Sequence, residues 1–134
     1  MPNQQPASDL IPTEHLARVA GAIALAAVAV IHVLDLPSTL KATPLIGYGY
    51  FLLIAVALLG AAMLITVPGP RVWAVVNLIA VGAIGAYVLS RTTGLPTDPL
   101  DIGNWNCALG IAAVSTETLI VLLTAYPPRG GRVL

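Results

Sequence analysis

The stretch that decides the fold is Leu45–Val67, LIGYGYFLLIAVALLGAAMLITV, which carries no charged side chain. The uncharged region is longer than this run and reaches from Ala42 to Pro70. A helix needs about 20 residues to cross a hydrocarbon core of about 30 Å, because it rises about 1.5 Å per residue. The stretch therefore predicts a transmembrane helix.

Three further apolar runs lie on either side of it, and all four have about 19 to 23 residues each. The 11 prolines fall in five groups between and outside these runs. Proline lacks an N–H and clashes in a helix interior, so the groups predict the connections. We expect an all-α membrane protein with four transmembrane helices in an up-down bundle. The expected organisation is a polar tail at 1–15, a membrane domain at 16–126 with spans at about 16–36, 45–67, 72–90 and 105–126, and a C-terminal tail at 127–134.

The composition excludes several classes of protein. Of the 134 residues, 57% are hydrophobic and 9% are charged, whereas a soluble domain has about 25% charged residues. The net charge of zero argues against nucleic acid as a partner. One cysteine allows neither an internal disulfide nor a CxxC site. The apolar run at 16–36 has no positively charged segment before it, so we expect a retained span and a multi-pass protein of the cell membrane.

The orientation is predicted from lysine and arginine, which gather on the cytoplasmic side. If both termini are cytoplasmic, four arginines lie inside (Arg18, Arg71, Arg129, Arg132) and two cations lie outside (Lys41, Arg91). The connection between the second and third runs is short, which predicts a tight hairpin. The two outer connections are expected to have about 8 and 14 residues. The residues expected to form an aromatic belt at that surface are Tyr48, Tyr50 and Trp105.

A glutamate lies near the middle of the fourth run, in Ser115–Thr118. A charge at that depth costs about 2.5 to 3.5 kcal/mol on insertion scales. Glu117 must therefore face the bundle interior with a partner, or be protonated. Asn77 on the third run differs from Glu117 in depth by about 6 Å, and we predict a direct or water-bridged hydrogen bond between them. A structural bond and a proton, ion or ligand role both remain open.

A histidine and an aspartate lie three residues apart near the end of the first run. His32 and Asp35 share a helix face, so the sequence predicts that Asp35 accepts a hydrogen bond from the imidazole. Such pairs occur behind metal ligands and in proton relays, and also at ordinary helix ends. Because a stable metal site needs three or four ligands, we predict no metal and no cofactor. Metal or haem handling through this pair stays an alternative.

The outer connection at 90–105 carries the remaining polar candidates. Arg91 is predicted to pair with Asp98 or Asp101. Asp101 or Asn104 is predicted to cap the fourth helix, because both residue types are favoured at that position.

The chain resembles a group of uncharacterised small four-span membrane proteins found mainly in high-GC Gram-positive bacteria. The resemblance is carried by His32, Asn77, Glu117 and the run Ser90–Pro96, SRTTGLP. It covers most of the four-span core and departs at 97–104, where members of the group often have an acidic, proline-rich loop. It brings no established activity, but it implies that these polar residues form a shared site.

The sequence favours a non-enzymatic accessory or ligand-binding bundle that acts at the outer membrane face, because no nucleophile, metal cluster or nucleotide motif is present. The alternative is a small proton-coupled transporter that uses Glu117. It would be similar in size to the small multidrug-resistance exporters, whose glutamate lies in the first span. The expected partners are the lipid bilayer and a larger membrane complex or a second copy of the chain. The candidate ligand or proton-site residues are His32, Asp35, Asn77, Arg91 and Glu117.

Overall fold

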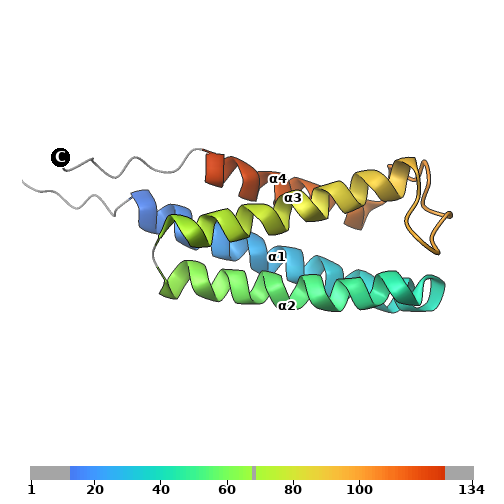
Figure 1. Cartoon of the computed structure of the whole chain (residues 1–134), viewed down its shortest axis with the longest axis horizontal. Helices are drawn as coiled ribbons and strands as arrows, with labels where there is room; N and C mark the ends of the chain where they lie inside the picture. The colour runs from blue at the N-terminus through green and yellow to red at the C-terminus, as the bar shows by residue number, and fades with distance from the viewer. Residues whose placement is uncertain (1–12, 68, 126–134) are drawn as a thin grey trace, which may run out of the picture.

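The computed structural model describes residues 13–67 and 69–125 and contains four α-helices (Figure 1). These are α1 (Thr13–Ala42), α2 (Pro44–Thr66), α3 (Pro70–Thr92) and α4 (Ala108–Ala125). Each helix is long and apolar enough to cross a membrane, and the described residues form no strand. The predicted all-α, four-span fold is confirmed, and the chain is a small multi-pass integral membrane protein. The predicted C-terminal tail, most of the N-terminal tail, Arg129 and Arg132 lie outside the described residues.

The four helices form a closed ring in chain order. Each helix packs on the next one, and α4 packs back on α1. Successive helices run in opposite directions along the bundle (Figure 1). The contact between α1 and α2 is the most extensive, and that between α2 and α3 is the least. We call the end with residues 93–107 the loop end, and the end where α2 leads into α3 the turn end.

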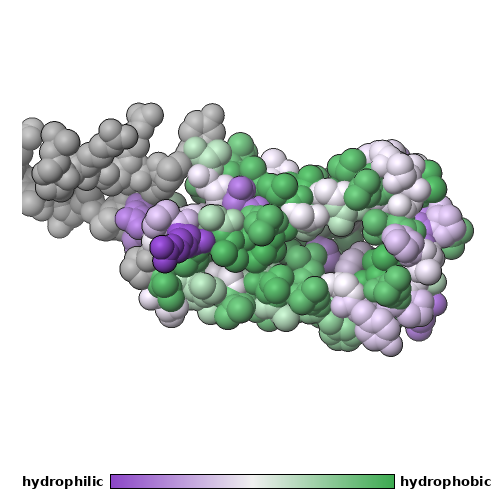
Figure 2. Space-filling view, in the orientation of Figure 1, coloured by the Kyte–Doolittle hydropathy of each residue, from purple (hydrophilic) through white to green (hydrophobic). Residues whose placement is uncertain are grey.

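The apolar core occupies the half of the bundle toward the turn end. Its fully buried side chains come from all four helices: Leu25, Val28, Leu64, Val76 and Ile120. Many large apolar side chains on the outside are exposed, and they form a hydrophobic band along the bundle with hydrophilic residues at both ends (Figure 2). An exposed apolar surface of this extent would aggregate in water and is suited to lipid.

The first helix is longer than predicted, because it does not end before Pro37. The helix continues through Pro37 to Ala42, so the predicted outer connection of about 8 residues is in fact the single residue Thr43. Proline removes one backbone donor from the helix, and the Ser38 hydroxyl donates to the Asp35 carbonyl nearby at 2.8 Å. Pro44 then occupies the first position of α2, where a missing N–H costs nothing.

The fourth helix begins later than predicted, at Ala108 instead of residue 105. Neither Asp101 nor Asn104 caps it, since both precede the helix by several residues. Asn104 Nδ2 donates instead to Asp101 Oδ1 at 3.1 Å. The backbone N–H of Gly103 donates to the Arg91 carbonyl at 2.9 Å, which folds the loop back against the end of α3. Gly103 has a φ of +78°, a conformation that glycine adopts without strain.

At the turn end, an arginine of α1 ties α2 in place. Arg18 Nε donates to the Leu64 carbonyl, and Arg18 Nη2 donates to the Ile65 carbonyl at 2.9 Å. Carbonyl groups in the last turn of a helix lack backbone partners, and a cation there also interacts favourably with the helix dipole.

Replacing Arg18 with methionine should lower the free energy of unfolding by about 1 kcal/mol, because the donors are lost and the aliphatic chain is kept. The measurement is thermal unfolding of the full chain in detergent. Arg71→Gln is the control, because Arg71 is exposed at the same end. Equal midpoints for the two variants would contradict the assigned role of Arg18.

Candidate functional site

The half of the bundle toward the loop end is hollow. A cavity of about 440 Å³ is enclosed by all four helices and the α3–α4 loop, within the range of about 300 to 1,000 Å³ typical of small-molecule sites. Figure 2 shows the hollow between α2 and α3, the pair with the least mutual contact. Gly49 and Gly82 lie in this part of the lining, and a side chain added at either would meet nothing within 4 Å. Small residues therefore leave the gap unfilled.

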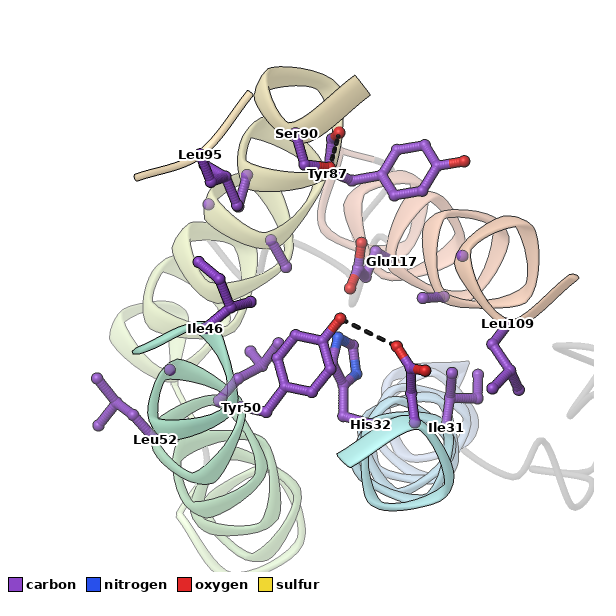
Figure 3. Close-up of a pocket in the computed structure, with 18 of the residues that line it drawn as sticks. Ile31, His32, Ile46, Tyr50, Leu52, Tyr87, Ser90, Leu95, Leu109 and Glu117 are labelled. Carbon is purple, nitrogen blue, oxygen red and sulfur yellow. Dashed lines mark hydrogen bonds between the residues drawn. The ribbon is translucent and has the colours of Figure 1, made fainter. Parts of the chain in front are cut away.

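Glu117 projects from the middle of α4 into this cavity (Figure 3). Its side chain is only 2% exposed. The Oε2 atom has no hydrogen-bond partner among the described residues. Glu117 therefore faces the bundle interior as predicted, and Ala113, one turn earlier on the same face, is also buried.

Glu117 and Asn77 do not form the direct hydrogen bond that was one of the two predicted arrangements. Asn77 Oδ1 accepts instead from Thr124 Oγ1 at 2.9 Å. The prediction assumed that α3 and α4 reach the same depth at the turn end. In Figure 1 the end of α4 lies farther into the bundle than the start of α3. This offset places Thr124 beside Asn77 and leaves Glu117 without its predicted partner.

The predicted bond between His32 and Asp35 is also wrong. His32 Nδ1 lies 2.8 Å from the Val28 carbonyl, four residues earlier. Side chains in a helix lean toward its N-terminus, so the imidazole reaches back to a carbonyl and not forward to Asp35. A carbonyl can only accept, so Nδ1 carries the proton and Nε2 keeps its lone pair in the neutral ring.

Asp35 instead holds a tyrosine of α2. Its carboxylate accepts from the Tyr50 hydroxyl at 3.1 Å and from the Ser38 hydroxyl at 3.0 Å. The Tyr50 ring lies edge-on to the His32 imidazole, with ring centroids 4.8 Å apart. Tyr50 therefore faces the cavity (Figure 3) and does not belong to the predicted aromatic belt, whereas Tyr48 is exposed on the outside.

Arg91 is buried at the loop end of the cavity. Its Nη1 forms the predicted ion pair with Asp101 Oδ2 at 2.5 Å and donates to the Ser90 hydroxyl at 3.3 Å. The guanidinium carbon lies 4.8 Å from the centroid of the Tyr87 ring, within reach of a cation–π interaction. Both groups lie over Gly110 of α4, where an added Cβ would be 2.6 Å from the Tyr87 ring.

Asp98, the other predicted partner of Arg91, makes no ion pair with a described residue but is buried within the loop. Burial raises the pKa of its carboxyl, and the charge of Asp101 raises it further. A raised pKa means that the folded state binds the proton more tightly than the unfolded state does. Asp98 therefore contributes most to stability below its unfolded pKa, and this contribution falls as the pH rises through its folded pKa.

Asp98→Asn should raise the thermal unfolding midpoint at pH 7.5, since asparagine resembles the protonated acid and carries no charge to bury. The increase should disappear at pH 2.5, where the wild-type carboxyl is protonated in both states. The measurement is thermal unfolding of both proteins at the two pH values. A gain of equal size at both values would show that the charge of Asp98 is not the cause.

The structure brings four of the five predicted site residues to one cavity: His32, Asp35, Arg91 and Glu117. Asn77 lies outside it. Tyr50 and Tyr87 also line the cavity, although neither was predicted to do so. A signal existed for Tyr50, because Tyr48 and Tyr50 are about 200° apart around a helix, so that only one of them can face the bundle.

The described residues contain no group of three or more His, Cys, Asp or Glu side chains that could hold a metal ion. His32 Nδ1 donates to the Val28 carbonyl, and the Asp35 carboxylate accepts from the Tyr50 hydroxyl. Comparison with known proteins finds no matching family model, no matching curated protein and no matching solved structure.

Proposed function

We propose that the chain is a non-enzymatic membrane protein that binds a small amphipathic ligand in its cavity, with the Glu117 carboxyl as the anchoring group. The observation that carries this proposal is the carboxyl itself, which is 2% exposed, points into the cavity and has an oxygen without a described partner. Buried polar groups are nearly always hydrogen-bonded. A carboxyl kept only for structure would have a partner in the bundle, as Asn77 has in Thr124.

The packing below the cavity supports binding over conduction. Toward the turn end the bundle is filled by fully buried side chains, among them Leu25, Val28 and Ile120. The described part of the cavity is therefore closed in that direction, and it opens between α2 and α3 (Figure 2). A ligand would reach it from the lipid or from the loop end, which is the predicted outer face.

Native mass spectrometry of the full chain, extracted gently from the cells that make it, tests this function. We expect a mass above that of the bare chain for the wild type and the bare mass for Glu117→Gln. Thr118→Val is the matched control, because Thr118 is the next residue along α4 and is exposed on the outside. It should keep the ligand. A bare wild-type chain that also binds no added ligand would contradict the proposal.

Proton-coupled transport is the second candidate, favoured by the position of Glu117 in the middle of a span. A transporter must expose this carboxyl to each side of the membrane in turn, so the packed half toward the turn end would have to open. Reconstituted vesicles distinguish the two functions. Uptake of a bound ligand driven by a pH gradient and lost in Glu117→Gln would establish transport, whereas binding without uptake would support the proposed function.

A further inference from the structure

We propose that the ligand is a lipophilic ammonium cation, meaning a protonated primary or secondary amine on a small apolar body. This inference rests on the proposed function and specifies the chemistry of the same cavity. It is carried by two properties of the lining: the polar atoms on its floor accept hydrogen bonds and do not donate them, and its acidic side chains outnumber its basic ones.

We call the side of the cavity next to the packed core its floor, and three polar groups from three different helices point into the cavity there. Figure 3 shows Glu117 of α4, His32 of α1 and Tyr50 of α2 pointing toward one another. All three line the cavity, and they are the groups that a polar ligand head would reach.

Each of these groups presents an acceptor. The His32 Nδ1 proton is committed to the Val28 carbonyl at 2.8 Å, so Nε2 offers a lone pair. The Tyr50 hydroxyl donates its proton to Asp35 at 3.1 Å, which leaves its oxygen free to accept. The Glu117 carboxyl only accepts in its ionised form, which a neighbouring cation favours. A hydroxyl could supply one proton to this floor, and a carboxylate or a quaternary ammonium none. A primary ammonium supplies three.

The charges of the lining also favour a cation. Its acidic residues are Asp35, Asp98, Asp101 and Glu117, and Arg91 is the basic one. The charges of Arg91 and Asp101 neutralise each other in their ion pair. No other described cation lines the cavity to face Glu117. In a water-poor cavity, an opposite charge next to a carboxylate is worth far more than in water. A ligand ammonium would provide the missing partner.

The other lining residues indicate what the rest of the ligand must be like. Apolar side chains such as Leu52, Leu78 and Leu109 form most of the wall, and the opening faces the side of the bundle between α2 and α3 (Figure 2). A small metal cation prefers about six to eight oxygen ligands, and this wall does not provide them. An amine with an apolar body can leave the lipid through this opening and place its head on the floor.

Isothermal titration of the full chain in lipid nanodiscs at pH 7.5 tests the inference, with hexylammonium as the probe and empty nanodiscs as the blank. Hexyltrimethylammonium keeps the charge but has no N–H, 1-hexanol has a hydroxyl and no charge, and hexanoate has the opposite charge. We expect hexylammonium to bind at least tenfold more tightly than each of these three. Glu117→Gln should weaken hexylammonium binding at least tenfold, and Thr118→Val should leave it unchanged.

A second variant keeps the test independent of Glu117. His32→Phe removes the acceptor and keeps an aromatic ring against Tyr50, so we expect it to weaken hexylammonium severalfold while 1-hexanol binding changes less. Circular dichroism of each variant confirms that it is folded.

The outcomes separate the ligand class from the proposed function. Equal binding of hexyltrimethylammonium, or Glu117-dependent binding of hexanol or hexanoate, would overturn the ammonium assignment and leave the ligand-binding function standing. If no probe binds and native mass spectrometry shows only the bare wild-type chain, the proposed function itself fails.

Discussion

Glu117→Leu should make the ligand-free protein more stable, by about 2 to 3 kcal/mol. The wild-type carboxyl is buried without a described partner for Oε2, and a charged side chain in the middle of a span costs about 2.5 to 3.5 kcal/mol on insertion scales. Leucine is similar in length and would fill part of the cavity with apolar atoms. The measurement is the thermal or denaturant-induced unfolding of both proteins in the same detergent at pH 7.5.

The sign of this effect separates the two interpretations of the residue. A structural glutamate bonded to another helix would lose a partner on substitution, and the protein would become less stable. Glu117→Gln should fall between the wild type and Glu117→Leu, because it removes the charge and keeps a buried polar group. Ile120→Ala is the control for sensitivity, since it truncates a fully buried core side chain on the same helix and must destabilise. A lower unfolding midpoint for Glu117→Leu than for the wild type would show that Glu117 has a structural role.

A stabilising Glu117 substitution would have a functional meaning. Residues that reduce stability persist where function requires them, and active or binding sites are where local rules of folding are broken. Other polar side chains of the described helices have partners: the Asn77 amide oxygen accepts from Thr124, and the Asp35 carboxylate accepts from the Tyr50 hydroxyl. Arg91 Nε, at the loop end of the same cavity, is the other buried atom without a described partner. Glu117 departs from this pattern in the same place where the bundle is hollow.

The spans could be predicted from the sequence because hydropathy and length determine what can cross a bilayer. The helix ends could not. Pro37 was expected to end the first helix, but one missing donor near a helix end is tolerated. Trp105 was expected inside the fourth helix because it is apolar, yet the loop holds it outside, where its backbone N–H donates to the Gly103 carbonyl at 3.0 Å. Hydropathy does not distinguish a membrane helix from an apolar loop packed on its end.

Four of the five predicted members of the site line the cavity, but among their predicted pairings only that of Arg91 with Asp101 is present. Polar side chains are rare in membrane spans, and this rule identified Glu117 and His32 as candidates. Pairing depends on the axial offset between helices and on side-chain direction. Because α4 is offset along the bundle relative to α3, Asn77 bonds to Thr124. Because the His32 side chain leans toward the N-terminus of α1, it bonds to the Val28 carbonyl. The sequence of a single helix does not reveal either property.

Arg91→Met should detach the α3–α4 loop and destabilise the protein by about 2 kcal/mol. Removing one partner of a fully buried ion pair costs about 3 to 5 kcal/mol, and the effect is smaller here because Asp101 is 37% exposed. The loss includes the contact with the Tyr87 ring, and it leaves Asp98 and Asp101 as neighbouring negative charges. Hydrogen exchange should become faster at residues 93–107 and stay unchanged in the core around Val76.

The matched variant is Asp101→Asn, which removes the same ion pair from the other side. It should lower the free energy of unfolding by less than Arg91→Met does. It removes a negative charge next to Asp98, and Arg91 keeps its contacts with the Tyr87 ring and the Ser90 hydroxyl. The double variant should be less destabilised than the sum of the two single variants, because their ion pair can be lost only once. If the destabilisations of the single variants add fully, the two side chains do not act as a pair. The loop would then have to be held by other contacts, such as the Gly103–Arg91 backbone bond and the bond from the Tyr87 hydroxyl to the Trp105 carbonyl.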